Sequence, residues 1–178
     1  MSPVAPLPQD PIAEAKRQWL DHGWAEAADG MAAVASLMRA QQIVLARVDA
    51  ALRPLGLSYA RFEILRLLAF TRDGALPMAS ASARLQVHPT SVTNVVDRLE
   101  RDGLVRRTAH PTDGRATLVQ VTEEGSSLAE AATRLLNRDV FSLPGIPPNE
   151  LTVLVRTLAD FRRAAGDFED SPAPPEPL

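Results

Sequence analysis

The feature that most constrains the fold is a change of hydrophobic period at Gly103. From residue 89 to 102, apolar side chains recur at three and four positions, as they do on one face of an α-helix. In residues 104–108 and 116–121 they alternate with polar side chains, which is typical of β-strands, and the turn sequence HPTDG (110–114) lies between. The pattern predicts a helix closed by a glycine and followed directly by a β-hairpin.

Helical patterns flank this pair on both sides. We expect helices over residues 11–24, 27–53, 58–72 and 78–86 before it, and over 122–140 and 149–165 after it. Helix, helix, short helix, helix and hairpin follow one another in the order of a winged helix-turn-helix. We therefore predict a mainly α fold, a winged helix-turn-helix with a two-stranded β-wing and helical extensions at both ends.

The length of 178 residues allows one compact core and is too short to argue for two. We predict a single domain over residues 11–168, with the winged core at about 57–122. The proline-rich ends, residues 1–10 and 169–178, are predicted to be disordered tails. Nothing resembles a signal peptide or a membrane span, so we expect a cytoplasmic protein without a membrane partner.

The sequence lacks the residues and motifs that several kinds of catalytic, redox and metal-binding site require. There is no cysteine, which excludes disulfides, thiolate metal sites, cysteine nucleophiles and thiol-based sensing. The three histidines, His22, His88 and His110, share no spacing that would bind a metal. No phosphate-binding loop, G-x-S-x-G elbow or H-E-x-x-H motif is present. We expect neither an enzyme nor a cofactor or metal site.

The helix that begins at Pro89 has two different faces. On a helical wheel, its aliphatic side chains Val92, Val95, Val96 and Leu99 share one face. The remaining surface carries Thr90, Ser91, Thr93, Asn94 and Arg98. Short polar side chains at the start of a helix fit the major groove of DNA, whose width is about 12 Å. They are also poor helix formers, so function explains them better than stability does. An ordinary surface helix remains the alternative.

Positive charge gathers around this helix, although the net charge of the chain is −3. Residues 84–115 contain six arginines and four acids, an excess of two positive charges in an acidic chain. We include Arg84, His88 and Arg107 among the predicted DNA contacts. The carboxylates Asp97 and Glu100 are expected to be neutralised by Arg101 or Arg98, of which Arg101 lies four residues after Asp97.

The predicted hairpin carries Arg115 near its tip. An arginine at a loop tip can enter the minor groove, whose negative potential favours it. Asp113, two residues earlier, can hold this side chain extended or can stabilise the turn beside Gly114. Considered alone, a solvated hairpin tip explains these residues equally well.

The run VHPTSVTNVVDRLERDGLVRR (87–107), followed by HPTDGRATLVQVTEEG (110–125), resembles the multiple antibiotic resistance regulator (MarR) family. The resemblance covers about residues 31–161, and the D-x-R element at 113–115 is its most specific mark. It implies a DNA-binding transcriptional regulator, by default a repressor, that a small and often phenolic ligand releases from DNA. It also implies a homodimer on a pseudo-palindromic operator, with dimerisation helices at about 11–53 and 122–166.

The resemblance also assigns roles to particular residues. Thr90, Ser91, Thr93, Asn94 and Arg98 match recognition-helix contacts, Arg115 matches the wing-tip arginine, and Asp113 matches the acid that anchors it. Two positions depart from the family pattern. His88 stands where a Ser or Asp usually caps the helix, and Ala81-Ser82 replaces a bulky aliphatic-Ala pair, which thins the packing beneath the motif.

The predicted N-terminal helix ends in an aromatic group, Trp19, His22 and Trp24. These side chains either dock the helix onto the dimer or line a pocket for a small aromatic or anionic effector. For the whole chain, the alternative function is a protein-interaction module that keeps the fold without binding DNA.

Overall fold

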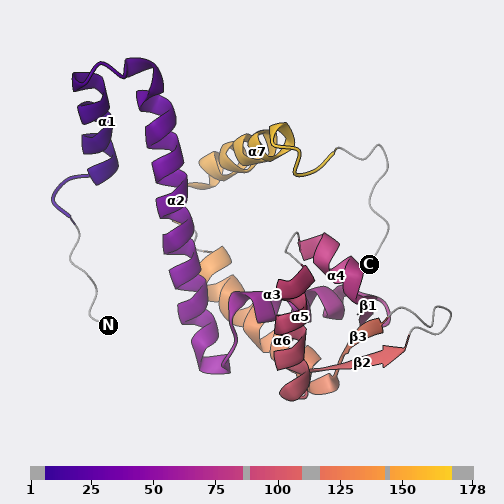
Figure 1. The fold of residues 1–178 in the computed structure, drawn as a ribbon. Helices are drawn as coiled ribbons and strands as arrows, with labels where there is room; N and C mark the ends of the chain where they lie inside the picture. The colour runs from indigo at the N-terminus through magenta and orange to yellow at the C-terminus, as the bar shows by residue number, and fades with distance from the viewer. Residues whose placement is uncertain (1–6, 86–88, 110–116, 143–144, 170–178) are drawn as a thin grey trace. The chain divides into compact units, whose positions relative to one another are not determined.

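The computed structural model describes residues 7–85, 89–109, 117–142 and 145–169 (Figure 1). Its helices are α1 (Pro11–Asp21), α2 (Ala25–Leu52), α3 (Tyr59–Phe70), α4 (Met78–Leu85), α5 (Pro89–Arg101), α6 (Glu123–Leu136) and α7 (Pro148–Ala164). A 3₁₀ turn, η1 (Arg53–Leu55), follows α2, and a π-helical turn, η2 (Asn137–Phe141), continues α6. The helices predicted from the sequence are confirmed, with ends that agree within a few residues.

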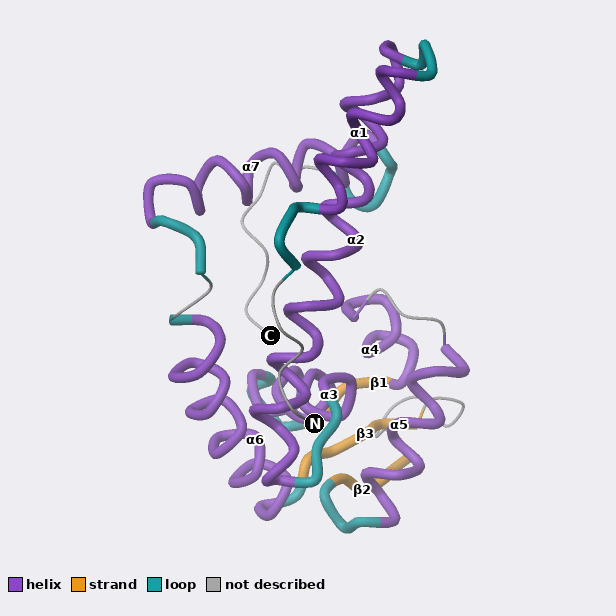
Figure 2. The backbone as a smooth tube through the Cα atoms, turned by 90° about the vertical axis from the view of Figure 1, so that its left-hand side faces the viewer, coloured by secondary structure: helices purple, strands orange, loops and turns teal. Residues whose placement is uncertain are grey.

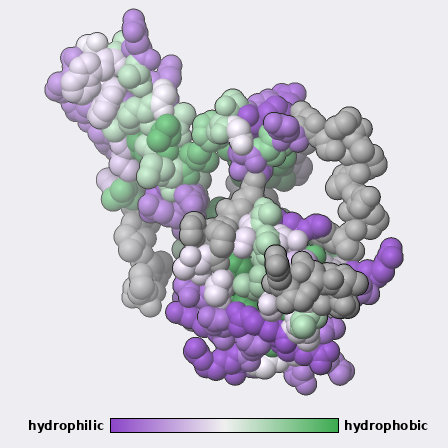
Figure 3. Space-filling model, turned by 45° about the vertical axis from the view of Figure 1, so that its right-hand side comes forward, coloured by the Kyte–Doolittle hydropathy of each residue, from purple (hydrophilic) through white to green (hydrophobic). Residues whose placement is uncertain are grey.

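The chain divides into two compact units, Met1–Arg47 and Val48–Leu178. In the first unit, Asp10 caps α1 by accepting a hydrogen bond from the backbone N–H of Ile12 at 2.9 Å. An ion pair of 2.5 Å between Lys16 and Asp29 joins α1 to α2. Many large apolar side chains of this part of α2 are exposed: Val34, Leu37, Met38, Ile43, Val44 and Leu45. Figure 3 shows this apolar surface in green on the N-terminal unit.

The second unit contains the main hydrophobic core, which includes Val48 and Leu52 of α2. The predicted aliphatic face of α5 is confirmed, because Val92, Val96 and Leu99 are no more than 1% exposed. Core side chains from α3, α4 and α6 pack in the same cluster: Phe62, Ile64, Leu65, Leu68, Ala81, Ala129, Ala132 and Leu136. Figure 2 shows α3, α4 and α5 beside the small sheet. The buried face of α5 leaves its other side for solvent or a ligand.

The sheet has three antiparallel strands, β1 (Ala75–Pro77), β2 (Val105–Ala109) and β3 (Thr117–Val121), in the order β1-β3-β2. The predicted hairpin is present, with Val105 opposite Val121. The sequence analysis missed β1, which pairs with β3 on the other side. This strand has only three residues and ends in proline, which is confined to edge strands or strand ends and weakens a strand pattern.

The last helix, α7, has no buried residue and exposes Val153, Leu154, Val155 and Phe161. No helix in the described part of the chain is long and apolar enough to cross a membrane. The predicted tails lie largely outside the described residues, and the extent of a single domain over 11–168 stays a prediction.

Candidate nucleic-acid interface

The polar side chains predicted to contact DNA share one side of α5. Thr90, Ser91, Thr93, Asn94 and Arg98 are all exposed, on the surface that the core does not cover. Arg84, in the last turn of α4, is exposed as well. His88, Asp113 and Arg115 lie outside the described residues. The structure therefore brings the helix contacts together, and the contribution of the wing tip stays a prediction.

The helix that precedes α5 is packed through a small side chain. Ala81 of α4 is 2% exposed, and the hydroxyl of Ser82 donates to the carbonyl of Met78 at 3.4 Å. This hydroxyl thus stays within its own helix, as Ser often does in helix interiors. At the position of this departure from the family pattern, α4 thus contributes only a methyl group to the core, while Met78 and Leu85 at its two ends pack against the core and are partly buried.

The acids of α5 have a partner that the sequence analysis did not choose. Arg107 of β2 donates from Nη2 to Asp97 Oδ1 at 2.5 Å and from Nη1 to Glu100 Oε2. Its backbone N–H also donates to Glu100 Oε1 at 2.9 Å. The expected pairing with Arg101 or Arg98 is wrong, because both carboxylates bind this arginine across the helix–strand contact. Local spacing on the helix carried no signal for it.

Arg107 is held as a cation in a half-buried position. Burial alone would lower the pKa of its guanidinium, but the hydrogen bonds and charges of Asp97 and Glu100 outweigh burial and raise the pKa above its usual value. The neighbouring Arg106 is exposed and donates to Gln120 Oε1 of β3 at 2.9 and 3.0 Å. Alternate residues of a strand face opposite sides, so of these two arginines it is Arg107 that is directed to α5.

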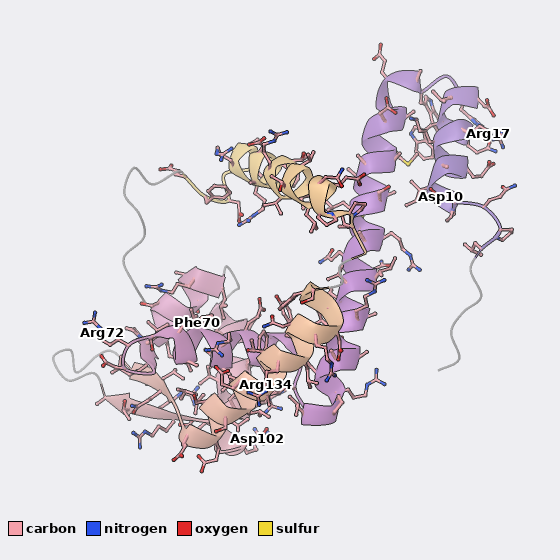
Figure 4. The ribbon with its side chains drawn as sticks, turned by 180° about the vertical axis from the view of Figure 1, so that it is seen from behind. Asp10, Arg17, Phe70, Arg72, Asp102 and Arg134 are labelled. Carbon is pink, nitrogen blue, oxygen red and sulfur yellow. The ribbon has the colours of Figure 1, made fainter. Side chains whose placement is uncertain are left out.

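The C-terminus of α5 is fixed by a glycine cap and an ion pair. Gly103 has a φ of 73°, and the N–H of Leu104 donates to the carbonyl of Leu99 at 2.9 Å, as expected for this type of helix end. Asp102, labelled in Figure 4, accepts a hydrogen bond from Arg61 of α3. The guanidinium of Arg61 also donates to the carbonyl of Gly56 at 3.1 Å. Sequence reasoning missed this pair, whose partners are 41 residues apart.

The aromatic residues of the first unit pack on one another where α1 turns into α2. The rings of Trp19 and Trp24 meet edge to face at 5.3 Å, and those of His22 and Trp24 lie 5.5 Å apart. His22 Nδ1 is 2.7 Å from the carbonyl of Gln18. Trp24 keeps 54% of its surface exposed. This packing favours a structural role, while the exposed ring leaves room for a further contact.

A separate hollow of about 930 Å³ lies in the same unit. It is lined by residues 7–12 and by Ala35, Met38, Arg39 and Gln42 of α2, and none of the three aromatic residues borders it. In the described part of the chain, no group of three His, Asp or Glu side chains is arranged to hold a metal ion.

Comparison with known proteins gives this arrangement a family. A model of the MarR family matches residues 55–116, from the end of η1 to the wing. The HTH-type transcriptional regulator Mb0904 of Mycobacterium bovis is 32% identical over 106 residues, which are 60% of this chain and 69% of that protein. The chain belongs to the MarR family. It is thus a winged helix-turn-helix transcriptional regulator, as the sequence analysis expected.

Solved structures, among them that of the MarR-family transcriptional regulator Sco5413, resemble it over most of its length. Sco5413 from Streptomyces coelicolor is 48% identical, with a TM-score of 0.71 over 80% of this chain and 99% of Sco5413. CouR from Rhodococcus jostii, solved with p-coumaroyl-CoA bound, is 29% identical, with a TM-score of 0.62 over 76% of this chain and 92% of CouR. The likeness to Sco5413 extends well beyond the residues that the family model matches.

Proposed function

We propose that this MarR-family chain is a repressor that binds a pseudo-palindromic double-stranded DNA operator as a homodimer in the cytoplasm. It acts by binding alone, without catalysis. The observation that carries the proposal is the division of α5 into an aliphatic face packed on the core, with Val92, Val96 and Leu99 buried, and an exposed face of short polar side chains. Packing on the core holds such a helix in place, so that its exposed side chains can contact base edges in the major groove.

In this proposal the winged core, residues 57–122, reads the DNA. Thr90, Ser91 and Asn94 face the bases, and Arg115, held by Asp113, enters the minor groove. Further contacts come from the predicted set of Thr93, Arg98, Arg84 and His88. The dimerisation helices, at about 11–53 and 122–166, are supported by the apolar side chains that α2 and α7 leave exposed.

The test is the affinity of single variants for the intergenic DNA beside the gene of this protein, measured by fluorescence anisotropy at several salt concentrations. We expect Asn94→Ala and Arg115→Ala each to weaken specific binding by about 1–3 kcal/mol, which corresponds to a factor of roughly 5 to 150. Arg17→Ala is the control, because it removes the same charge as Arg115→Ala but from α1 (Figure 4). In α1 the side chain of Arg17 pairs with Glu14 and Asp21.

Unchanged affinity and unchanged salt dependence in both variants would overturn the assignment of the reading residues. Absence of any specific binding by the wild-type protein would instead favour the alternative, an interaction module that retains the fold. The two outcomes are distinct, since the first requires an operator complex and the second excludes one.

We also propose that a small aromatic or anionic effector releases the protein from DNA, by favouring a spacing of the two reading helices that does not fit the operator. The ligand in the CouR structure, p-coumaroyl-CoA, supports this chemical class. Trp19 and Trp24 are the only tryptophans, so intrinsic fluorescence reports on them alone. Release of DNA by p-coumaroyl-CoA with a matching fluorescence change supports an effector site at Trp19, His22 and Trp24. Release of DNA without a change in tryptophan fluorescence would instead favour the alternative, in which these residues dock the N-terminal helix onto the dimer.

A further inference from the structure

Arg107 was predicted to contact DNA, but its donors are directed elsewhere. Two guanidinium nitrogens and the backbone N–H of this residue are all used by Asp97 and Glu100. Its side chain is 27% exposed, compared with 46% for Asp97 and 37% for Glu100. Two carboxylates bonded to one guanidinium neutralise its positive charge, so its attraction for a phosphate is reduced.

The contact joins the two elements that the proposed function uses to read DNA. Asp97 and Glu100 belong to α5, whereas Arg107 belongs to β2, the first strand of the wing. The planar guanidinium forms one hydrogen bond to each carboxylate, which fixes the orientation of the strand against the helix more tightly than a single charge would. The backbone N–H bond to Glu100 adds a third constraint at the same residue.

We propose that Arg107 is a positioning residue that holds the recognition helix and the wing as one rigid reading unit, acting through Asp97 and Glu100. The proposal rests on the proposed function, since it assumes that α5 and the wing bind DNA together. In this arrangement Arg107 does not touch the DNA. Its loss lowers specific affinity because α5 and the wing no longer reach their grooves in a fixed relative orientation.

The proposal predicts an effect of opposite sign to simple electrostatics. Asp97 and Glu100 are two negative charges on the helix that faces phosphates, so their removal should strengthen DNA binding if charge alone matters. If the carboxylates instead hold Arg107, the double variant D97N/E100Q weakens specific binding while it strengthens binding to unrelated DNA. A fall in the ratio of specific to non-specific affinity is therefore the signature.

The experiment measures specific and non-specific affinity and the salt slope for R107Q, R107K, D97N/E100Q and the triple variant. We expect R107Q to lose specific affinity at least tenfold with the salt slope unchanged, whereas loss of a phosphate contact would reduce the slope by about one. R107K keeps the charge but cannot bond both carboxylates in the same plane, so it should also lose specific affinity. The triple variant should lose little more than R107Q alone.

R106Q is the matched control, because it removes the adjacent arginine of β2, which bonds Gln120 and not α5. Affinities are compared well below each variant's melting temperature, so that unfolding does not contribute; if R107Q does not fold, R107K carries the test. A salt slope reduced by about one in R107Q, or full specific affinity in R107K and D97N/E100Q, would overturn the proposal. A wild-type protein that fails to bind its operator would instead overturn the proposed function, and this inference with it.

Discussion

At Gly125 the fold leaves no room for a side chain. A Cβ at this position would lie 2.0 Å from the carbonyl oxygen of Leu104 and 3.0 Å from a methyl group of Val121. The same carbonyl accepts the N–H of Thr122 at 3.1 Å, and the Thr122 hydroxyl both accepts the N–H of Gly125 and donates to Gly103. The start of α6 is thus locked onto the turn that closes α5. Gly125 ends the run 110–125 that resembles the MarR family, but the local sequence gives no physical reason for a glycine there, because its neighbour is a backbone atom 21 residues away.

Gly125→Ala should lower the free energy of unfolding by about 2–3 kcal/mol, because backbone rather than a flexible side chain must move to admit the methyl group. Gly30→Ala is the control. A Cβ at Gly30, inside α2, has nothing within 4 Å in this chain, so alanine should leave stability unchanged or raise it by up to about 1 kcal/mol. Chemical denaturation at equal chain concentration checks both values. Equal stabilities for the two variants would contradict the tight contact at Gly125.

At the scale of elements, the sequence predicted what depends on local pattern and missed what depends on pairing. The helices and the buried face of α5 follow from the spacing of apolar side chains that a single segment displays. Strand β1 and the bonds of Arg107 exist only because separate segments meet in the folded chain. The helix-spacing rule selected Arg101 for Asp97 for the same reason, since it considers partners on one helix only.

The contact between α3 and α5 contains a carboxyl group whose stability effect should depend on pH. Glu63 lines a cavity of about 50 Å³ with Ser91 and Val92. Burial raises the pKa of Glu63, and a hydrogen bond from Tyr59 opposes the shift without cancelling it. The folded protein therefore holds this proton to a higher pH than the unfolded chain. The contribution of Glu63 to stability falls as pH rises from the unfolded pKa through the folded one.

Glu63→Gln should consequently melt at a higher temperature than the wild type at pH 7, and the difference should shrink as the pH approaches 4. Glu130→Gln is the control of opposite sign. Hydrogen bonding to Arg66 lowers the pKa of Glu130, so this variant should melt below the wild type at pH 7 and approach it at low pH. Melting curves at pH 4 and 7 give both comparisons. The argument would be refuted if the melting temperature of Glu63→Gln minus that of the wild type were lower at pH 7 than at pH 4.

At the scale of the whole molecule, one apolar stripe on α2 is buried at its end and exposed along the rest. Val48 and Leu52, at its end, are buried in the core of the second unit. Val34, Met38 and Leu45, from the same helical stripe, are 60%, 59% and 40% exposed. Periodicity alone does not distinguish a face that packs within a chain from one that packs between chains. Exposure of contiguous large apolar side chains indicates a surface that a second chain covers.

The double variant V34E/M38E should therefore dissociate the dimer without unfolding the chain. Both side chains are exposed within the protomer, so glutamate costs little there, but two charges on each side of the proposed interface must be desolvated and repel one another. We expect the dimer dissociation constant to rise at least tenfold by sedimentation equilibrium, with helix content unchanged by circular dichroism. Operator affinity should also fall, because one protomer reaches only one half-site. Phe70→Glu is the control, since Phe70 is equally exposed, at 60%, but lies at the end of α3, outside the proposed dimerisation helices. If V34E/M38E sediments as a dimer, or if Phe70→Glu dissociates the protein instead, the interface does not include this face of α2.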